Sequence, residues 1–261
     1  CCQKEGSLKM FFPLILLVLL VLGCNFSISG MATPTNDAST TEAAVLTNTP
    51  QPKPEEIATN TPQPTLTAYP SPTVQAVVLY QDDFSDNMSG WERGQYNIGS
   101  VGYTDDGEYL VFAYGQSYVW GVASQYFYDF TLDVDVTQVQ APGNNNNVYG
   151  VIVRAGNWDE LEGYWFAISR DGYAGIFLFQ NGSLDVIADW PNSPAVYTGN
   201  ATNHFTITCD GSFLEFAING QVIGSITDST LTSGDIAFMA ASMESEVTEI
   251  HFDNIVITEP R

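Results

Sequence analysis

The chain has 261 residues, of which 44% are hydrophobic, and it carries 30 acidic against 7 basic side chains, a formal net charge of −23 at neutral pH. Nucleic-acid binding depends on basic residues that displace counterions from phosphates, so this charge excludes nucleic acid as a main partner. It also argues against adsorption of the protein surface to anionic lipid, and it favours neutral ligands or divalent cations over anions.

An apolar run from Met10 to Leu22 follows two lysines, Lys4 and Lys9. Its length of about 13 residues is below the ~20 that a membrane-spanning helix needs, and it lies within the range of a signal-peptide core. Residues 1–23 are therefore predicted to form a signal segment. An uncleaved membrane anchor and a buried helix are the alternatives.

The apolar run ends in the order Val21-Leu22-Gly23-Cys24, which resembles the lipobox of bacterial lipoproteins. In that family the cysteine is lipidated on its sulfur and becomes the new amino terminus after cleavage. The resemblance implies that Cys24 carries acyl chains and anchors the protein to a membrane. It also implies that the rest of the chain is extracytoplasmic, at the cell envelope or surface.

Residues 24–76 are rich in Thr, Pro, Ala, Ser and Asn, and the hexapeptide at 47–52 repeats at 59–64. A segment with so little apolar surface cannot offset the entropy of ordering its backbone, so a disordered linker is predicted. Its reach lies between ~40 Å as a flexible coil and ~160 Å as polyproline II. We interpret it as a stalk; a proline-motif ligand is the alternative.

Residues 77–261 are predicted to form one β domain. Phe127 to Val136 alternates apolar and polar residues, as a half-buried strand does. Turn pairs such as Asn181-Gly182 and Asn219-Gly220 separate further strand-like runs. No segment has a sustained helical period, so an antiparallel two-sheet sandwich is the best fit. The other runs are 108–114, 148–154, 164–169, 174–179, 184–190, 204–209, 213–218, 221–226, 236–241 and 247–258.

Cys209 alternates with Phe205 and Ile207 on the apolar side of one predicted strand. A single thiol in that position is expected to be a small buried side chain. After cleavage only Cys24 and Cys209 would remain, so the sequence predicts neither a disulfide framework nor a cysteine-rich metal site.

Three stretches resemble a known family: Asp83-Phe84-Ser85-Asp86 with Ser89-Gly90-Trp91; residues 150–154 followed by 163–168 and 171–173; and residues 213–222 followed by 252–255. In this order they resemble the concanavalin A-like lectin/glucanase superfamily, close to the 3-keto-disaccharide hydrolase domain. The resemblance covers about residues 79–259. It implies a jelly-roll of two curved antiparallel sheets whose concave face holds saccharide.

Aromatic rings can stack on the apolar faces of sugars, and the domain contains many of them. Arg154 ends an otherwise apolar strand, where a charge is costly unless it faces a wet cleft or a carboxylate. Arg154 and Tyr164 also match the Arg then Tyr-aromatic-Phe pattern of the family. We expect Arg154, Tyr164, Trp158, Trp120 and Tyr149 to contact ligand, with core packing between the sheets as the alternative for each aromatic residue.

Hydrolysis of a glycoside needs two carboxylates at a defined separation. Asp133 and Asp135 share one strand face, and Glu249, His251 and Asp253 share another. Solvated outer faces explain both sets more simply, and no Gly-x-Ser-x-Gly motif accompanies a histidine. The sequence therefore assigns no catalytic residue.

Calcium is the one cofactor that the sequence suggests. Asp83 near the first strand and Asp253 on the last would approach each other if the terminal strands pair, and calcium prefers several such oxygens. The alternative role of Asp253 is to bond backbone groups at the edge of the sandwich.

The leading functional hypothesis is a lipid-anchored surface domain that binds carbohydrate, a glycan or polysaccharide. A glycoside hydrolase of a modified disaccharide or β-glucan and an adhesive domain without sugar ligand are the alternatives. Outer-face positions for Asp133, Asp135 and Glu249 would favour binding over hydrolysis.

Overall fold

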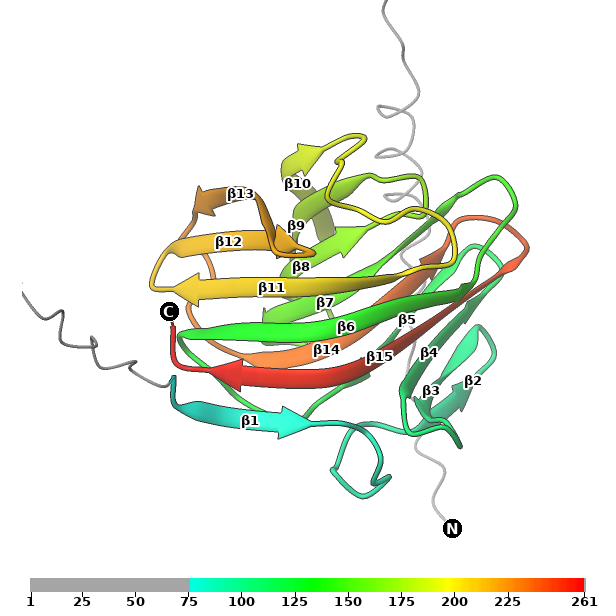
Figure 1. Ribbon diagram of the computed structural model, residues 1–261, viewed down its shortest axis with the longest axis horizontal. Helices are drawn as coiled ribbons and strands as arrows, with labels where there is room; N and C mark the ends of the chain where they lie inside the picture. Colours follow the sequence, from blue (N-terminus) through cyan, green and yellow to red (C-terminus); the bar gives the residue numbers. More distant parts are fainter. Residues whose placement is uncertain (1–75, 261) are drawn as a thin grey trace, which may run out of the picture.

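The computed structural model describes residues 76–260, which form fifteen β-strands in two antiparallel sheets (Figure 1). The predicted signal segment, Cys24 and nearly all of the predicted linker lie outside these residues. Within the described residues there is no helix that is long and apolar enough to cross a membrane.

The larger sheet has nine strands, and the smaller sheet has six. The order in the larger sheet is β13 (Gln221–Thr227), β12 (Phe213–Ile218), β11 (Thr202–Asp210), β6 (Phe130–Gln140), β15 (Val247–Thr258), β4 (Tyr109–Tyr114), β3 (Gly99–Tyr103) and β2 (Gly94–Tyr96), and β1 (Val78–Asp82) also pairs with β15. The order in the smaller sheet is β10 (Ser183–Trp190), β9 (Ala174–Gln180), β8 (Gly163–Ile168), β7 (Asn147–Ala155), β14 (Asp235–Ser242) and β5 (Ser117–Val122).

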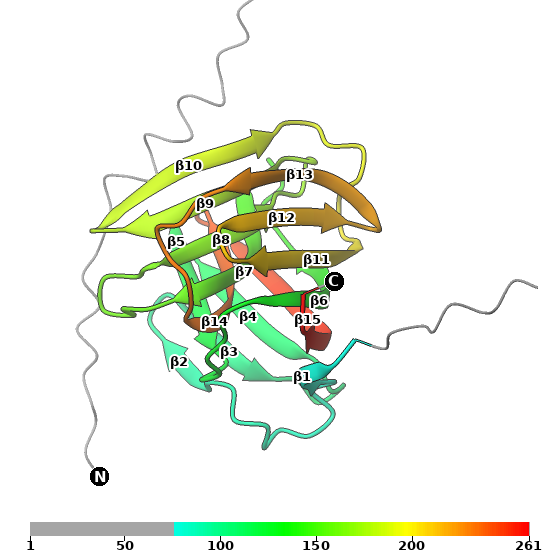
Figure 2. The same cartoon turned by 90° about the vertical axis from the view of Figure 1, so that its left-hand side faces the viewer.

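The two sheets are stacked face to face, with β6, β11 and β15 in front of β7, β8 and β14 in Figure 1 and the layers seen from the side in Figure 2. Strands β4 and β5 are consecutive but belong to different sheets, so the turn between them joins the layers at one edge. This arrangement confirms the predicted all-β, antiparallel two-sheet jelly-roll.

The core between the sheets contains the residues that alternation predicted. Phe130, Leu132, Val134 and Val136 of β6 have no exposed surface, whereas the intervening aspartates face outward. Cys209 is buried in the same layer, and burial raises the pKa of its thiol to about 12. The predicted burial of this thiol is confirmed.

An aromatic stack closes the core near the β4–β5 edge. Trp91 stacks on Phe238 at 4.4 Å between ring centroids, and Phe238 stacks on Phe252 at 4.0 Å. Phe84 packs edge-on against Trp91 at 5.5 Å. The Phe84 and Trp91 motifs therefore hold the segments around β1 and β2 against the sandwich.

Apolar residues also cover the outer face of the six-stranded sheet. Trp165, Phe177 and Met239 belong to this second cluster, separate from the core between the sheets. Strands β7, β8 and β9 are therefore apolar on both faces, which explains why their sequences do not alternate.

Candidate functional site

A surface pocket of about 620 Å³ lies beside β5, the edge strand of the six-stranded sheet. This volume is within the usual range for small-ligand sites. The pocket walls combine four aromatic side chains with two carboxylates: Tyr96, Trp120, Tyr126, Trp158, Glu92 and Asp235.

Four separate segments of the chain meet at this pocket. Trp120 lies on β5, and Tyr126 lies in the connection from β5 to β6. Trp158 comes from the turn between β7 and β8, and Asp235 is the first residue of β14. Tyr96 ends β2. The pocket therefore depends on the sandwich corner, where elements distant in sequence converge.

Glu92 is held rigidly on one wall. Its carboxylate accepts hydrogen bonds from the Tyr96 hydroxyl at 2.7 Å and from the Val122 backbone N–H at 3.4 Å. Its backbone N–H donates to the Val122 carbonyl, and its own carbonyl accepts from the Tyr109 hydroxyl at 2.7 Å. The carboxylate is thus preorganised as an acceptor at the pocket.

Asp235 occupies another wall. One of its carboxylate oxygens accepts backbone N–H groups from Gln125 at 2.8 Å and Ile236 at 2.7 Å. Burial raises the pKa of this carboxyl, while these hydrogen bonds and one from the Trp158 side chain act in the opposite direction. Asp235 therefore links the β5–β6 connection to β14.

Trp120 continues the aromatic surface away from the pocket. Its ring stacks on Tyr118 with 5.9 Å between centroids and 21° between planes. Both residues pack against the outer apolar cluster of the six-stranded sheet. The pocket is thus one end of a larger aromatic surface.

Residues 80–258 match the sequence profile of the 3-keto-alpha-glucoside-1,2-lyase-like domain. The chain belongs to this family. The match spans most of the chain and confirms the predicted resemblance. No curated protein gives a significant match to the chain.

Solved structures similar to this family member share its sandwich fold at low sequence identity. A carbohydrate-binding module, CBM66, from Bacillus subtilis has a TM-score of 0.54 at 20% identity over 66% of this chain and 98% of the module. A β-glucanase from Bacillus licheniformis has a TM-score of 0.53 at 14% identity over 70% of this chain and 98% of the enzyme. The catalytic domain of an endo-1,3-β-glucanase (laminarinase) from Thermotoga petrophila has a TM-score of 0.53 at 8% identity over 72% and 99%. The fold is that of carbohydrate-binding modules and glucanases.

Two of the five predicted ligand residues, Trp120 and Trp158, lie together in the pocket. Tyr149 and Tyr164 instead point into the core between the sheets and have no exposed surface. Both tyrosines pack in the core between the sheets, which was the alternative expected for aromatic residues. They offer no surface to a ligand, so the interpretation of both as cleft residues is corrected.

Arg154 is also fully buried, so its interpretation as a ligand contact is corrected to a structural one. Two residues of β7 oppose one residue of β14 here, a β-bulge, and Arg154 has a positive φ of 52°. A bulge redirects a side chain from the face that alternation would give it. The guanidinium consequently points to the end of the sandwich instead of the outer face.

The guanidinium joins three connections at that end. It donates hydrogen bonds to the carbonyls of Gly211 at 2.8 Å, Leu231 at 3.0 Å and Tyr128 at 3.3 Å, and it pairs with Asp129 at 3.1 Å. These partners compensate the free-energy cost of burying the Arg154 charge. Arg154 thus fixes the loops that carry Tyr126 and Asp235 into the pocket.

The Tyr164 hydroxyl contacts the β13–β14 loop, which also contains Leu231, a partner of Arg154. It donates to the Asp228 carboxylate and accepts the Leu231 backbone N–H at 3.2 Å. Burial, with the hydrogen bond to Asp228, raises the pKa of Tyr164 to about 12. Both backbone groups of Leu231 are therefore hydrogen-bonded: its N–H donates to the Tyr164 hydroxyl, and its carbonyl accepts from the Arg154 guanidinium.

We expect Tyr164→Phe to lower the free energy of unfolding by about 1–2 kcal/mol, because the partly buried Leu231 N–H loses its acceptor. Tyr149→Phe is the matched control, since the Tyr149 hydroxyl is buried without a hydrogen-bond partner in the described structure. It should leave stability unchanged or raise it slightly. Urea unfolding of both variants measures this difference, and equal losses would contradict the assigned role.

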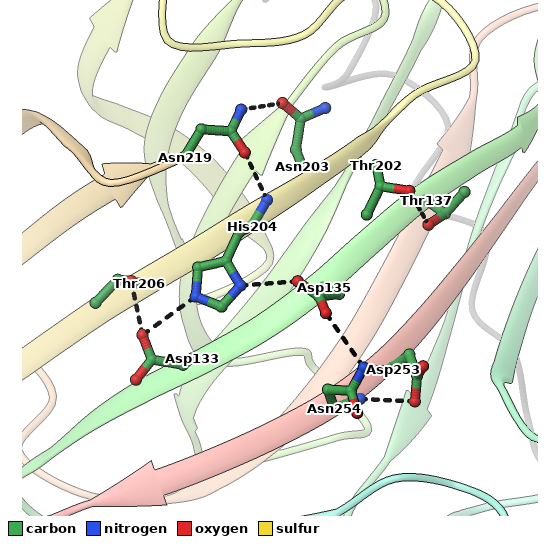
Figure 3. Close-up of polar contacts among 10 residues, drawn as sticks. All are labelled: Asp133, Asp135, Thr137, Thr202, Asn203, His204, Thr206, Asn219, Asp253 and Asn254. Atoms are coloured by element: carbon green, nitrogen blue, oxygen red, sulfur yellow. Dashed lines mark hydrogen bonds and ion pairs between the residues drawn. The ribbon is translucent and has the colours of Figure 1, made fainter.

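The outer face of the nine-stranded sheet carries the carboxylates that were considered for catalysis. His204 lies between Asp133 and Asp135, with 2.8 Å from Nδ1 to Asp135 and 3.5 Å from Nε2 to Asp133 (Figure 3). Thr206 donates to Asp133, and Asn254 donates to Asp135. These polar groups satisfy one another across β15, β6 and β11.

His251 has the same arrangement further along that face, with Glu108 at 2.6 Å and Glu249 at 2.9 Å. Asp133, Asp135 and Glu249 therefore all lie on the outer face of the nine-stranded sheet, away from β5 and its pocket. This outcome is the one that favours binding over hydrolysis by these carboxylates.

The His204 cluster predicts a pH dependence of stability. Hydrogen bonding to Asp133, joined by the hydrogen bond and charge of Asp135, raises the pKa of His204 from 6.5 to about 9 despite partial burial. A raised pKa in the folded state stabilises the protein fully below the unfolded-state pKa, and this stabilisation is lost as the pH rises through the folded-state value. The window is therefore from pH 6.5 to about 9.

We expect the stabilisation to be below about 1 kcal/mol, because 44% of the His204 side chain is exposed and solvent screens the pair. Urea unfolding at about pH 6 and pH 9.5 should show that wild type loses more stability between these values than His204→Gln. Parallel pH profiles for the two proteins would contradict the interpretation.

The two predicted calcium ligands, Asp83 and Asp253, form hydrogen bonds with residues close to them in the sequence. The Asp83 carboxylate accepts from Ser85, and that of Asp253 accepts from Asn254. No group of three or more His, Cys, Asp or Glu residues suited to a metal ion occurs among residues 76–260. Of the alternative role, the backbone bond is present, from the Asn254 N–H to Asp253, but β15 lies in the middle of the nine-stranded sheet and not at its edge.

Of the six aromatic and acidic residues of the pocket, sequence reasoning missed four: Tyr96, Tyr126, Glu92 and Asp235. Asp235 stands between a glycine and an apolar run, a position that also suits an ordinary turn. Nothing local distinguishes Glu92 from the other acidic residues. Only the contacts across the corner bring them together.

Proposed function

We propose that this protein binds a neutral carbohydrate in the pocket beside β5. The observation that carries the proposal is the convergence of Trp120 and Trp158 with two fixed carboxylates, Glu92 and Asp235. Aromatic faces stack on the apolar faces of sugar rings, and carboxylates accept hydrogen bonds from sugar hydroxyls. The net charge of −23 favours neutral glycans over sulfated or phosphorylated ones.

Family membership and the fold shared with a carbohydrate-binding module and with glucanases support the same ligand class. A glycan array probed with the purified protein tests the proposal. Neutral glucans should be enriched, while sulfated glycans of similar size should not. Absence of any enrichment over blank spots would overturn carbohydrate binding and favour an adhesive role.

A second candidate is cleavage of a sugar in the same pocket, in keeping with the family description of a 3-keto-α-glucoside lyase. Asp235 favours it, because burial raises the pKa of this carboxyl and a raised pKa suits a general acid. Incubation with a 3-keto-α-glucoside would then release the aglycone. Asp235→Asn should abolish that release, and a wild-type protein without release would exclude this candidate.

We also propose that lipidated Cys24 tethers the domain outside the cytoplasmic membrane. The support is the order Leu22-Gly23-Cys24 after an apolar run. A radiolabelled fatty acid should be incorporated into wild type and not into Cys24→Ser. Equal labelling of the two proteins, or no labelling of either, would remove the anchor from the proposal.

A further inference from the structure

Two tyrosines project from the rim of the pocket into solvent. Tyr126 and Tyr128 are 63% and 66% exposed, the highest values among the exposed aromatic residues of the described structure. Their rings form an edge-to-face pair with 5.5 Å between centroids and 73° between planes. Tyr126 also lines the pocket, so the pair continues the pocket surface outward.

The backbone that carries this pair is held on both sides. Phe127, between the two tyrosines, exchanges two backbone hydrogen bonds of 2.9 Å with Gly234 and packs its ring on Phe130. Gly234 in turn packs closely on β7, where a Cβ atom would lie 2.3 Å from the Ala155 carbonyl oxygen. The connection therefore cannot collapse to bury its tyrosines.

The Tyr126 side chain and the Tyr128 backbone are held as well. The Tyr126 hydroxyl is 2.7 Å from the Ser233 hydroxyl, and the Tyr128 carbonyl accepts the Arg154 guanidinium. A rigid exposed aromatic pair loses little conformational entropy when a ligand stacks on it. The buried Arg154 thus fixes the backbone that carries the exposed aromatic pair at the pocket rim.

We propose that Tyr126 and Tyr128 form a second subsite that takes further rings of a neutral oligosaccharide whose first ring occupies the pocket. This inference rests on the proposed carbohydrate binding and specifies its ligand as a chain and not a single sugar. Trp120, Trp158 and Tyr126 line the pocket, and the ring pair of Tyr126 with Tyr128 extends this aromatic lining beyond it. Hydroxyl-rich, uncharged rings are the ligand that such contacts recognise in a strongly acidic protein.

The test measures affinity against chain length by isothermal titration, with glucose and laminari-oligosaccharides of two to six rings as probes. For the wild-type protein, affinity should rise about tenfold as rings reach the second subsite. Tyr128→Ala should remove this rise while leaving the affinity for the shortest bound probe unchanged. Tyr128→Phe should retain the rise, because the ring remains.

Tyr197→Ala is the matched control, since this tyrosine is 56% exposed and lies in the connection between β10 and β11. It should behave as wild type. A wild-type affinity that does not depend on length, or a rise that Tyr128→Ala preserves, would overturn the second subsite alone. Failure of every probe to bind wild type would overturn the proposed function together with it.

Discussion

Arg154→Ala is expected to lower the free energy of unfolding by about 3–5 kcal/mol, the largest stability loss that we predict from this structure. The substitution empties a fully buried volume and removes the donors to the carbonyls of Tyr128, Gly211 and Leu231. The melting temperature should fall by about 10 °C or more for a domain of this size. Thermal unfolding followed by circular dichroism measures this loss.

The same experiment includes Asp129→Asn, which removes the charge of the partner but keeps an oxygen for the Arg154 guanidinium and the Gly211 N–H. Asp129 is 46% exposed, so this exchange should cost less than about 1 kcal/mol. If Arg154→Ala unfolded at the temperature of wild type, the guanidinium would not be the group that joins the three connections.

The fold of this domain could be predicted because its signals are local. Alternation over residues 130–136 and the pairs Asn181-Gly182 and Asn219-Gly220 act within a few residues, and the last two have the positive φ values that such turns need. No range was predicted for strands β1, β2, β3 and β5. They are short, three to six residues, and they form only because the sandwich pairs or covers them.

The candidate site could be predicted only in part. Trp120 and Trp158 were found from residue type alone, since aromatic rings can stack on the apolar faces of sugars. Asp235 and Gln125 are 110 residues apart, and no local pattern records their contact. Arg154 was expected in a cleft because its charge interrupts an apolar strand, and the β-bulge that buries it is a product of tertiary pairing with β14.

Trp158→Ala is expected to weaken carbohydrate binding by about 30- to 100-fold, or about 2–3 kcal/mol, the largest functional loss that we predict. The ring lies on a turn and lines the pocket, so its removal deletes a stacking face without disrupting a strand. Isothermal titration with the tightest-binding neutral glucan measures the loss.

Trp158→Phe separates the two roles of this residue. It keeps an aromatic face but loses the N–H that bonds to Asp235, a bond that lowers the pKa of that carboxyl. We therefore expect a smaller loss of affinity and a raised pKa of Asp235, visible as a shift of the acid limb of binding toward higher pH. If Trp158→Ala remained folded and bound glucan as wild type does, the sugar would have to bind elsewhere on the sandwich, and Tyr118, whose ring stacks on Trp120, would be the next residue to mutate.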